Sequence, residues 1–304
     1  MKIKFTSLIV IVLAVTLCFG LFGCGKEFDM STLETSWEVP DYESGEVVAD
    51  MSAFDLYIDA VENYYNEDYI WYGRSFSFEA GGGILATQQS VEITKYNNGN
   101  IFNQIVKDGT KLGKEDLGRR YYYDASDNKT YQAESKDDKT NFATIADANW
   151  AGLSDYAEKD TGDDATASAN DKMAFTSYVI TSRDNLSSSH NDTVYKIGDK
   201  YYICMTIKCM EIEEGTVQAT VEQEIEDGLG STVEAGSFLW LADTIIIIEI
   251  EEVDGVMLPT AKNMEESYEA KQAAMVSSHQ ITSGKYTYSE EAAEITDEEL
   301  NNLD

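Results

Sequence analysis

Alternating apolar and polar residues dominate the chain from residue 69 onward. In IIIIEIEEVDGVML, Ile246, Ile248 and Ile250 fall on one side of a two-residue period and glutamates fall on the other. This alternation is typical of a strand with one buried face and one solvent-exposed face. The Asp254-Gly255 pair that follows suits a two-residue hairpin turn. The pattern predicts two antiparallel strands joined at this turn.

Similar patterns recur through the rest of this region. TVYKIGDKYYICMTIKCMEI predicts a second hairpin, around Gly198-Asp199, and TVQATVEQEI predicts a strand with Val217 and Val221 on its apolar face. Short strands joined by Asn, Asp and Gly turns favour antiparallel pairing. Further strands are predicted in SFSFEA, SVEITKY, IFNQIVKDG, RRYYYDA, KTYQAE and MAFTSYVI.

A helix is predicted just before these strands, in MSAFDLYIDAVENYYNED. Ser52 and Asp55 approximate a capping box at its start. A single apolar stripe at helical spacing implies that the helix docks on another element. The residues of this stripe are Phe54, Ile58, Val61 and Tyr65.

A polar, low-complexity stretch at residues 157–172 interrupts the strands. We expect a flexible loop there within one domain, residues 51–289, although two separate domains would also fit the pattern. The class is α+β, mainly antiparallel β, with an N-terminal helix packed on the sheet. Residues 290–304 hold seven acidic residues and no basic one, so we expect a frayed acidic tail.

The amino end carries the pattern of an export signal. Lys2 and Lys4 precede a charge-free apolar run from Phe5 to Phe22, which matches the basic and apolar parts of a signal peptide. A run of this length also just suffices for a permanent membrane-spanning helix. The residues at the end of the run bear on that choice.

Leu21-Phe22-Gly23-Cys24 resembles the lipobox of bacterial lipoproteins, with Phe22 bulkier than the usual occupant of its position. The resemblance implies that residues 1–23 are cleaved as a signal and that Cys24 carries a diacylglyceryl group. Two acyl chains anchor a protein far more firmly than one. The expected location is extracytoplasmic, on the cell membrane, with residues 24–50 as an acidic tether. The alternative is an uncleaved signal anchor in which Cys24 has no role.

The charge balance narrows the class of partner. The chain has 22 basic and 56 acidic residues, and removal of Lys2 and Lys4 with the signal leaves a formal charge of −36. Such a field repels phosphate backbones, so we expect no nucleic-acid partner. The acidity could serve as a surface for cations or basic partners, or simply as a solubilising coat.

Two cysteines, Cys204 and Cys209, remain beyond the anchor region. Five residues of one strand would separate their Cα atoms by roughly 16 Å, whereas a disulfide needs less than about 7 Å. We therefore expect two free thiols.

Few residues suggest catalysis or metal binding. His190 and His279 are the only histidines, and neither belongs to a recognisable triad or to a metal pair; both are expected in surface loops. Gly81-Gly82-Gly83 and the Asp124–Asn128 stretch suit turns better than a phosphate cradle or an EF-hand. No catalytic residue, metal ligand or cofactor is predicted.

Aromatic residues offer one candidate binding surface. YYNEDYIWYGRSF and RRYYYD could present rings that stack on sugars, through Trp71, Tyr72 and Tyr121–Tyr123. Tyrosine is also a common strand residue at the edge of a core. Both interpretations remain open.

The order of lipobox, acidic tether, amphipathic helix and long antiparallel strands is similar to that of LolA/LppX-like lipoproteins. The likeness implies a curved, half-barrel-like sheet that wraps helices around an apolar cavity for a lipid or another hydrophobic ligand. It rests on element order, so no ligand-binding residue can be assigned. The inward-facing residues would line either a cavity or a filled core; they are Phe54, Ile58, Val217, Val221, Ile246 and Ile248.

Three functions stay open from the sequence. The first is a membrane-anchored extracytoplasmic lipoprotein that binds a lipid or hydrophobic ligand without catalysis. The second is a surface interaction or sensor module for a protein or glycan partner. The third is an enzyme, for which the sequence offers no catalytic motif. A receptor for an ABC importer does not fit, because strands do not alternate with helices.

Overall fold

The structure, a computed structural model, describes residues 35–80, 86–108, 117–134, 154–159, 192–207, 240–270 and 277–301. The chain divides into two units, Met1–Met30 and Ser31–Asp304, and all described residues belong to the second. Several predictions therefore lie outside the described residues. They concern Leu21, Phe22, Gly23, Cys24, Gly81–Gly83, residues 160–172, MAFTSYVI, His190, Cys209, Val217 and Val221.

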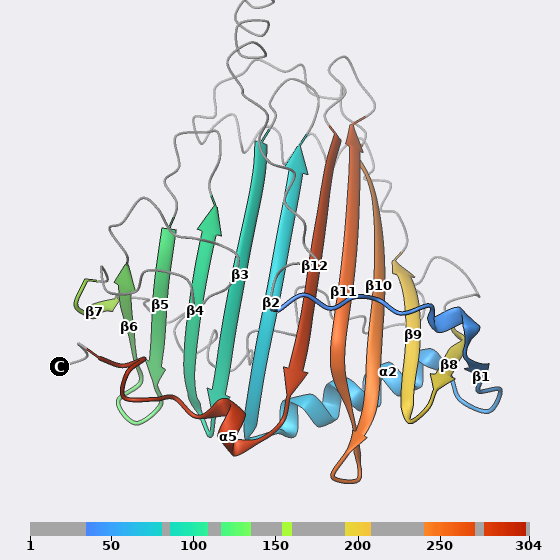
Figure 1. Cartoon of the computed structure of the whole chain (residues 1–304), viewed down its shortest axis with the longest axis horizontal. Helices are drawn as coiled ribbons and strands as arrows, with labels where there is room; N and C mark the ends of the chain where they lie inside the picture. The colour runs from blue at the N-terminus through green and yellow to red at the C-terminus, as the bar shows by residue number, and fades with distance from the viewer. Residues whose placement is uncertain are drawn as a thin grey trace, which may run out of the picture. The chain divides into compact units, whose positions relative to one another are not determined.

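Short helices and twelve strands make up the described part of the chain (Figure 1). The first elements are η2 (Tyr42–Ser44), β1 (Glu46–Val47), α2 (Ala53–Asn66), β2 (Tyr69–Ala80), β3 (Ala86–Asn97), β4 (Asn100–Asp108), β5 (Leu117–Asp124) and β6 (Lys129–Glu134). The remaining elements are β7 (Ala157–Lys159), β8 (Val194–Ile197), β9 (Lys200–Ile207), β10 (Trp240–Val253), β11 (Val256–Ala270), β12 (Ser277–Thr287) and α5 (Glu290–Ala293).

All twelve strands belong to one sheet, in the order β1-β8-β9-β10-β11-β12-β2-β3-β4-β5-β6-β7. Each neighbouring pair is antiparallel. The sheet is curved and open (Figure 1), with one long helix, α2, packed on it. The predicted α+β class with a curved, mainly antiparallel sheet is confirmed. Strands from both sides of residues 160–191 join the same sheet.

Both predicted hairpins are present. β8 and β9 meet at Gly198, whose φ is +62°, and β10 and β11 meet at Asp254 and Gly255, with φ of +51° and +88°. Positive φ at both turn residues is the geometry that favours Asp-Gly. The Asp124–Asn128 stretch likewise links β5 to β6. His279 was wrongly expected in a loop, because it lies on β12, a strand that the pattern did not reveal.

Helix α2 begins where the capping residues predict, but a different face is buried. Ser52 is the N-cap and accepts a hydrogen bond from the Asp55 amide. Of the expected stripe, Val61 alone is fully buried, while Phe54, Ile58 and Tyr65 lie at the margin. The sheet covers a stripe about one position further round. Its members are Ala53, Leu56, Tyr57, Ala60, Val61 and Tyr64.

The residues beneath α2 form a packed apolar core. The helix lies over β9, β10 and β11, and its buried residues contact Ile203, Ile246, Ile248 and Ile250. Because Ile246 and Ile248 are about 1% exposed, this part of the sheet carries the filled core rather than an open cavity. Such burial is the largest favourable term in folding.

The acidic tether was expected to reach residue 50, and this is wrong for residues 35–50. Residues 35–45, here called the N-terminal strap, cross the face of the sheet opposite α2 (Figure 1). Trp37 packs against Tyr202 and Ala261. Its amide donates to Ser283 Oγ at 2.8 Å and its carbonyl accepts from the same hydroxyl at 3.0 Å. One buried indole ties this acidic segment to the sheet.

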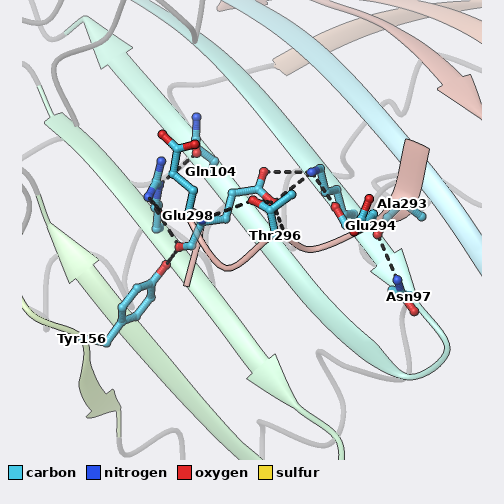
Figure 2. Close-up of polar contacts among 10 residues, drawn as sticks. Asn97, Gln104, Tyr156, Ala293, Glu294, Thr296 and Glu298 are labelled. Atoms are coloured by element: carbon cyan, nitrogen blue, oxygen red, sulfur yellow. Dashed lines mark hydrogen bonds and ion pairs between the residues drawn. The ribbon is translucent and has the colours of Figure 1, made fainter. Parts of the chain in front are cut away.

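The frayed tail expected from residue 290 is also wrong for residues 290–301. This segment, here called the C-terminal strap, forms α5 and a further turn that crosses β3, β4 and β5 (Figures 1 and 2). Thr296 and Glu299 form a capping box: the Thr296 amide donates to the Glu299 carboxylate at 2.9 Å, and the Glu299 amide donates to Thr296 Oγ1 at 3.3 Å. That T-x-x-E motif was a readable signal for order here.

Two further points concern the boundaries. The first three residues of the loop expected at 157–172 form β7, which pairs with β6. Among the described residues, no helix combines the length and apolar character needed to cross a membrane.

Candidate functional site

The sheet has two covered faces with different chemistry. The face under α2, here called the helix face, carries Ile248, Tyr72 and Ile203 among its side chains. The opposite face, here called the strap face, carries Tyr202 and Ala261, which pack against Trp37 of the N-terminal strap. Side chains alternate between the two faces along a strand. The strand register therefore shows on which face each of the remaining strand residues lies.

One row of residues across the helix face changes from apolar to charged. Ile203 and Ile248 pair across β9 and β10. The row continues from Ile248 through cross-strand partners on β11, β12, β2, β3, β4, β5 and β6, in the order Lys262, Gly284, Arg74, Glu92, Ile105, Arg119 and Glu134. We call Lys262, Arg74, Glu92, Arg119 and Glu134 the charged band. It begins on β11, one of the strands that α2 covers.

Direct polar contacts hold the middle of the charged band. Arg74 Nη2 donates to the Glu92 carboxylate. Asn103 Nδ2 donates to the other Glu92 oxygen at 2.5 Å and to Thr94 Oγ1 at 2.9 Å. Glu92 is 6% exposed, so these donors replace the hydrogen bonds that its carboxylate would make to water. At the far end, Arg119 and Glu134 form an ion pair of 2.9 Å on the more open β5 and β6.

Lys262 is the most deeply buried cation of the charged band. It is 4% exposed, and Glu266, two rows further along β11's face, is 1% exposed. Burial lowers the pKa of Lys262 to about 8, and the positive charge of Arg74 lowers this pKa as well, while Glu266 raises it. A buried lysine that is partly neutral near physiological pH is costly to maintain, and such groups cluster at functional sites.

Tyrosine rings lie between the charged band and the core of α2. Tyr72 and Tyr286 stack with centroids 4.4 Å apart, and Tyr64 of α2 meets Tyr286 edge to face at 5.8 Å. Burial raises the pKa of Tyr72 to about 12. Gly284 makes room for this stack, because a Cβ there would lie 2.6 Å from the Tyr72 ring.

The aromatic stacking surface suggested by the sequence is not assembled. Tyr72 and Tyr122 are buried, at 3% and 7% exposure. The register places Trp71 and Tyr122 on the strap face but Tyr72, Tyr121 and Tyr123 on the helix face. The five candidates therefore do not form one surface for a sugar ring.

A separate polar cluster lies on the strap face around Glu249. This carboxylate, 6% exposed, accepts from Lys200 Nζ at 2.8 Å, from Tyr202 Oη at 2.8 Å and from Thr260 Oγ1 at 3.0 Å. Its oxygens are thus satisfied by residues of β9 and β11. Nearby Cys204 is a free, half-buried thiol whose pKa is raised by burial.

The histidines and acidic residues offer no metal site within the described part of the chain. His279 Nε2 lies 2.8 Å from Glu265 Oε1 on the strap face, in a half-exposed pair.

Sequence reasoning missed the charged band for a clear reason. Lys262 and Glu266 share a two-residue phase with buried Met264, which was a readable signal of buried charge. Glu92 lies between Val91 and Ile93 on β3. The sequence of this strand predicts one apolar face, with Val91 and Ile93, and one solvent-exposed face, with Glu92. Only the fold shows that Glu92 is buried and that its partners come from the neighbouring strands, Arg74 from β2 and Asn103 from β4.

Comparisons with known proteins identify no family for this chain. No family model matches it, and no curated protein matches it. A solved structure described as an N-terminal dehydratase from a difficidin assembly line aligns over 83% of this chain and 91% of that one, with 10% identity and a TM-score of 0.11. A similarity this low carries no argument about fold or function.

Proposed function

We propose that the chain is an extracytoplasmic bacterial lipoprotein, anchored through a diacylglyceryl group on Cys24, whose helix face binds an amphiphile without catalysis. The observation that supports binding most directly is the row from Ile203 and Ile248 to Lys262 and Arg74. Within this row a packed apolar surface passes directly into buried charge.

The anchor part of the proposal rests on the amino end. A basic start, an apolar run and Leu21-Phe22-Gly23-Cys24 together suit export followed by lipid attachment. The sheet holds the chain from Thr35 onward, so the acidic tether is shorter than the composition suggests. Residues 25–34 would connect the lipid to the sheet.

The binding part of the proposal rests on the cost of burying charge. Moving Lys262, Glu266 and Glu92 out of water costs several kcal/mol per ion, although apolar residues of the same size would fill the space more cheaply. A ligand with a polar head and an apolar tail makes use of such a surface, because the head meets fixed charges and the tail meets isoleucines. Since α2 already fills the space over β9, β10 and part of β11, the ligand's head would lie along the rest of β11 and along β2 and β3.

Lipid attachment is tested by replacing the thiol that carries it. The full-length chain and a Cys24→Ala variant are expressed with radiolabelled palmitate in a bacterial host. We expect label and membrane retention in the parent and neither in the variant. A parent chain that stays in the membrane without label and with an uncleaved signal would contradict the anchor.

Amphiphile binding is tested by native mass spectrometry of the chain from Lys26 to Asp304, compared with its denatured mass. We expect a bound species of lipid size that is lost on denaturation, and reduced occupancy in a Lys262→Met variant. Glu265→Gln provides the matched control, because Glu265 neighbours the same strand segment but is exposed on the strap face. A clean apo mass with no uptake of lipid or hydrophobic dye would contradict this function.

A second candidate, an interaction module for a protein partner, is favoured by a different observation. The strap face holds an acidic segment of the chain itself, the C-terminal strap, through side-chain contacts to its backbone (Figure 2). This arrangement is independent of the charged band.

A further inference from the structure

The C-terminal strap is held mainly through its main-chain oxygens. Figure 2 shows this segment lying across neighbouring strands of the sheet, which are β3, β4 and β5. Lys95 Nζ donates to the Glu294 carbonyl at 2.7 Å, and Asn97 Nδ2 donates to the Ala293 carbonyl at 3.2 Å. These two donors extend from the same strand, β3, two residues apart and therefore on the same face.

Two further donors secure the other end of the strap. Arg120 Nη1 donates to the carbonyls of Glu298 and Glu299, both at 3.4 Å, and Tyr156 Oη donates to the Glu299 carbonyl at 2.8 Å. Gln104 orients Arg120, since its Oε1 accepts from Arg120 Nε at 3.0 Å. The donors come from β3, β5 and the residue before β7, so the sheet's register builds the receptor surface.

One side chain of the C-terminal strap also makes a direct contact with the sheet. Both oxygens of the Glu299 carboxylate lie against Lys95 Nζ, at 2.8 and 2.9 Å. The two side chains are 13% and 18% exposed, so water screens this ion pair only partly. A charge-assisted contact of this kind is roughly twice as strong as a neutral hydrogen bond.

Together these contacts define what the surface recognises. Contacts to main-chain carbonyls accept almost any residue, whereas the contact to Glu299 requires a carboxylate. The other acidic side chains of the strap are exposed and add little to the specificity; they are Glu290, Glu291, Glu294, Asp297 and Glu298. The site therefore selects a short peptide with one well-placed acidic residue.

We propose that Lys95, Asn97, Arg120 and Tyr156 form a binding site for an acidic peptide segment of another protein, which the C-terminal strap occupies in cis. This does not depend on the amphiphile-binding function; it rests on the second candidate, the interaction module, and names its partner. The peptide partner would offer the same groups as the C-terminal strap. These are main-chain carbonyls at a turn and one carboxylate that faces Lys95. The strap acts as an intramolecular competitor that the partner displaces.

Competition from the C-terminal strap lowers the affinity of the intact chain for a peptide partner. A tethered segment presents itself at an effective concentration in the millimolar range, so the intact chain should bind a free copy of the peptide weakly. The chain's large negative charge opposes an acidic partner at a distance. At physiological ionic strength the Debye length is about 8 Å, so this repulsion is screened while contacts of 2.8 Å to Lys95 are kept.

The test uses a fluorescein-labelled peptide with the sequence of residues 288–301 and measures its anisotropy with the full chain in 0.15 M salt. A Thr296→Val/Glu299→Gln variant weakens the strap but leaves the four donors intact. We expect this variant to bind the peptide roughly 100-fold more tightly than the parent chain, because the competitor is released. Adding Lys95→Gln to the variant should abolish the gain.

Controls distinguish specific recognition from charge attraction. A peptide with glutamine at the position of Glu299 keeps most of the charge but loses the contact to Lys95, and it should bind at least about tenfold more weakly. A scrambled peptide of identical composition should not bind. Equal binding of all three peptides would overturn the proposal.

Folding of the variant is checked by circular dichroism. If the variant does not fold, the parent chain with a protease site between Tyr288 and Ser289 is cut after folding, and the same titration is repeated. No peptide binding to a folded chain with a released strap would overturn the proposal, since the C-terminal strap would then serve only to cover the sheet.

Discussion

The two straps cover the same face of the sheet by different physical means. The N-terminal strap is fixed by one buried indole, Trp37, and by hydroxyl contacts to Ser75 and Ser283. The C-terminal strap is fixed by cationic and polar side chains that grip its backbone, with Lys95 at the centre. The first uses the hydrophobic effect and the second uses electrostatics, although both segments are acidic.

This difference teaches which segments of an acidic chain can be released. Burying an aromatic side chain gains most of its free energy from water exclusion, which salt does not weaken. Polar contacts at the surface exchange readily with water and are weakened by salt. The N-terminal strap should therefore behave as part of the fold, and the C-terminal strap as a segment that a partner can displace.

The largest expected effect is on the N-terminal strap. Trp37→Ala removes a side chain that packs against Tyr202 and Ala261 and is 9% exposed. We expect the free energy of unfolding to fall by about 3 kcal/mol, measured by urea denaturation, with little change on adding salt. Val47→Ala, at a position that is 55% exposed, should change it by less than about 0.5 kcal/mol. A similar loss for both variants would contradict a fixed N-terminal strap.

A smaller effect tests the close approach of this strap to the sheet. A Cβ at Gly73 would lie 2.7 Å from Thr35 Cγ2 and 2.5 Å from the Trp71 ring. Gly73→Ala should therefore cost about 1–3 kcal/mol through overpacking. Thr35→Ser keeps the hydroxyl that contacts Ser75 and removes the methyl group, so it should recover part of this loss in the double variant.

The control for that experiment is Gly284→Ala, whose Cβ would meet the Tyr72 ring on the other face of the sheet. Thr35→Ser should not relieve its loss of stability. Equal relief of both variants in thermal or urea unfolding would show that the effect is not local to the N-terminal strap.

The C-terminal strap should respond to charge and salt. Lys95→Gln removes the ion pair with Glu299 and should lower the free energy of unfolding by about 1 kcal/mol at low salt. We expect the difference to shrink in 1 M salt, where the Debye length is about 3 Å. Lys129→Gln, which breaks the more exposed pair with Glu158, should cost less. A salt-independent loss would contradict the electrostatic attachment.

The smallest effect concerns alkaline pH. Burial raises the pKa of Tyr156 to about 12, and Glu299 raises it as well, while Arg120 lowers it. An unfolded chain releases this proton near pH 10, so the stabilisation from Tyr156 is present below pH 10 and is lost as the pH rises to 12. Tyr156→Phe should make the decline in the free energy of unfolding over this range shallower. The slope of Val47→Ala should match that of the parent, because this exposed position carries no titrating group.

Much of the fold could be predicted from the sequence because its signals are local. The period of two in β10, the Asp254-Gly255 turn and the Ser52 cap each act within a few residues. The T-x-x-E motif at Thr296 was equally local, and its neglect led to the wrong prediction of a frayed tail. β12 escaped detection because its apolar residues do not alternate clearly in SSHQITSGKYT.

Neither the straps nor the charged band could be predicted, because both depend on residues far apart in the chain. Trp37 meets Ser283, and Lys95 meets Glu299, across more than 200 residues. The row from Lys262 to Glu92 arises only because β11, β12, β2 and β3 are neighbours in the sheet. No local pattern encodes that order.

The sequence by itself determined the strands, their turns, the start of the helix and the acidic character, since hydrophobic period and backbone preference are properties of neighbouring residues. Only the tertiary structure decided which charges are buried, which face of α2 meets the sheet and which acidic segments are held. Burial and pairing depend on what covers each residue, and here the covering elements come from distant parts of the chain.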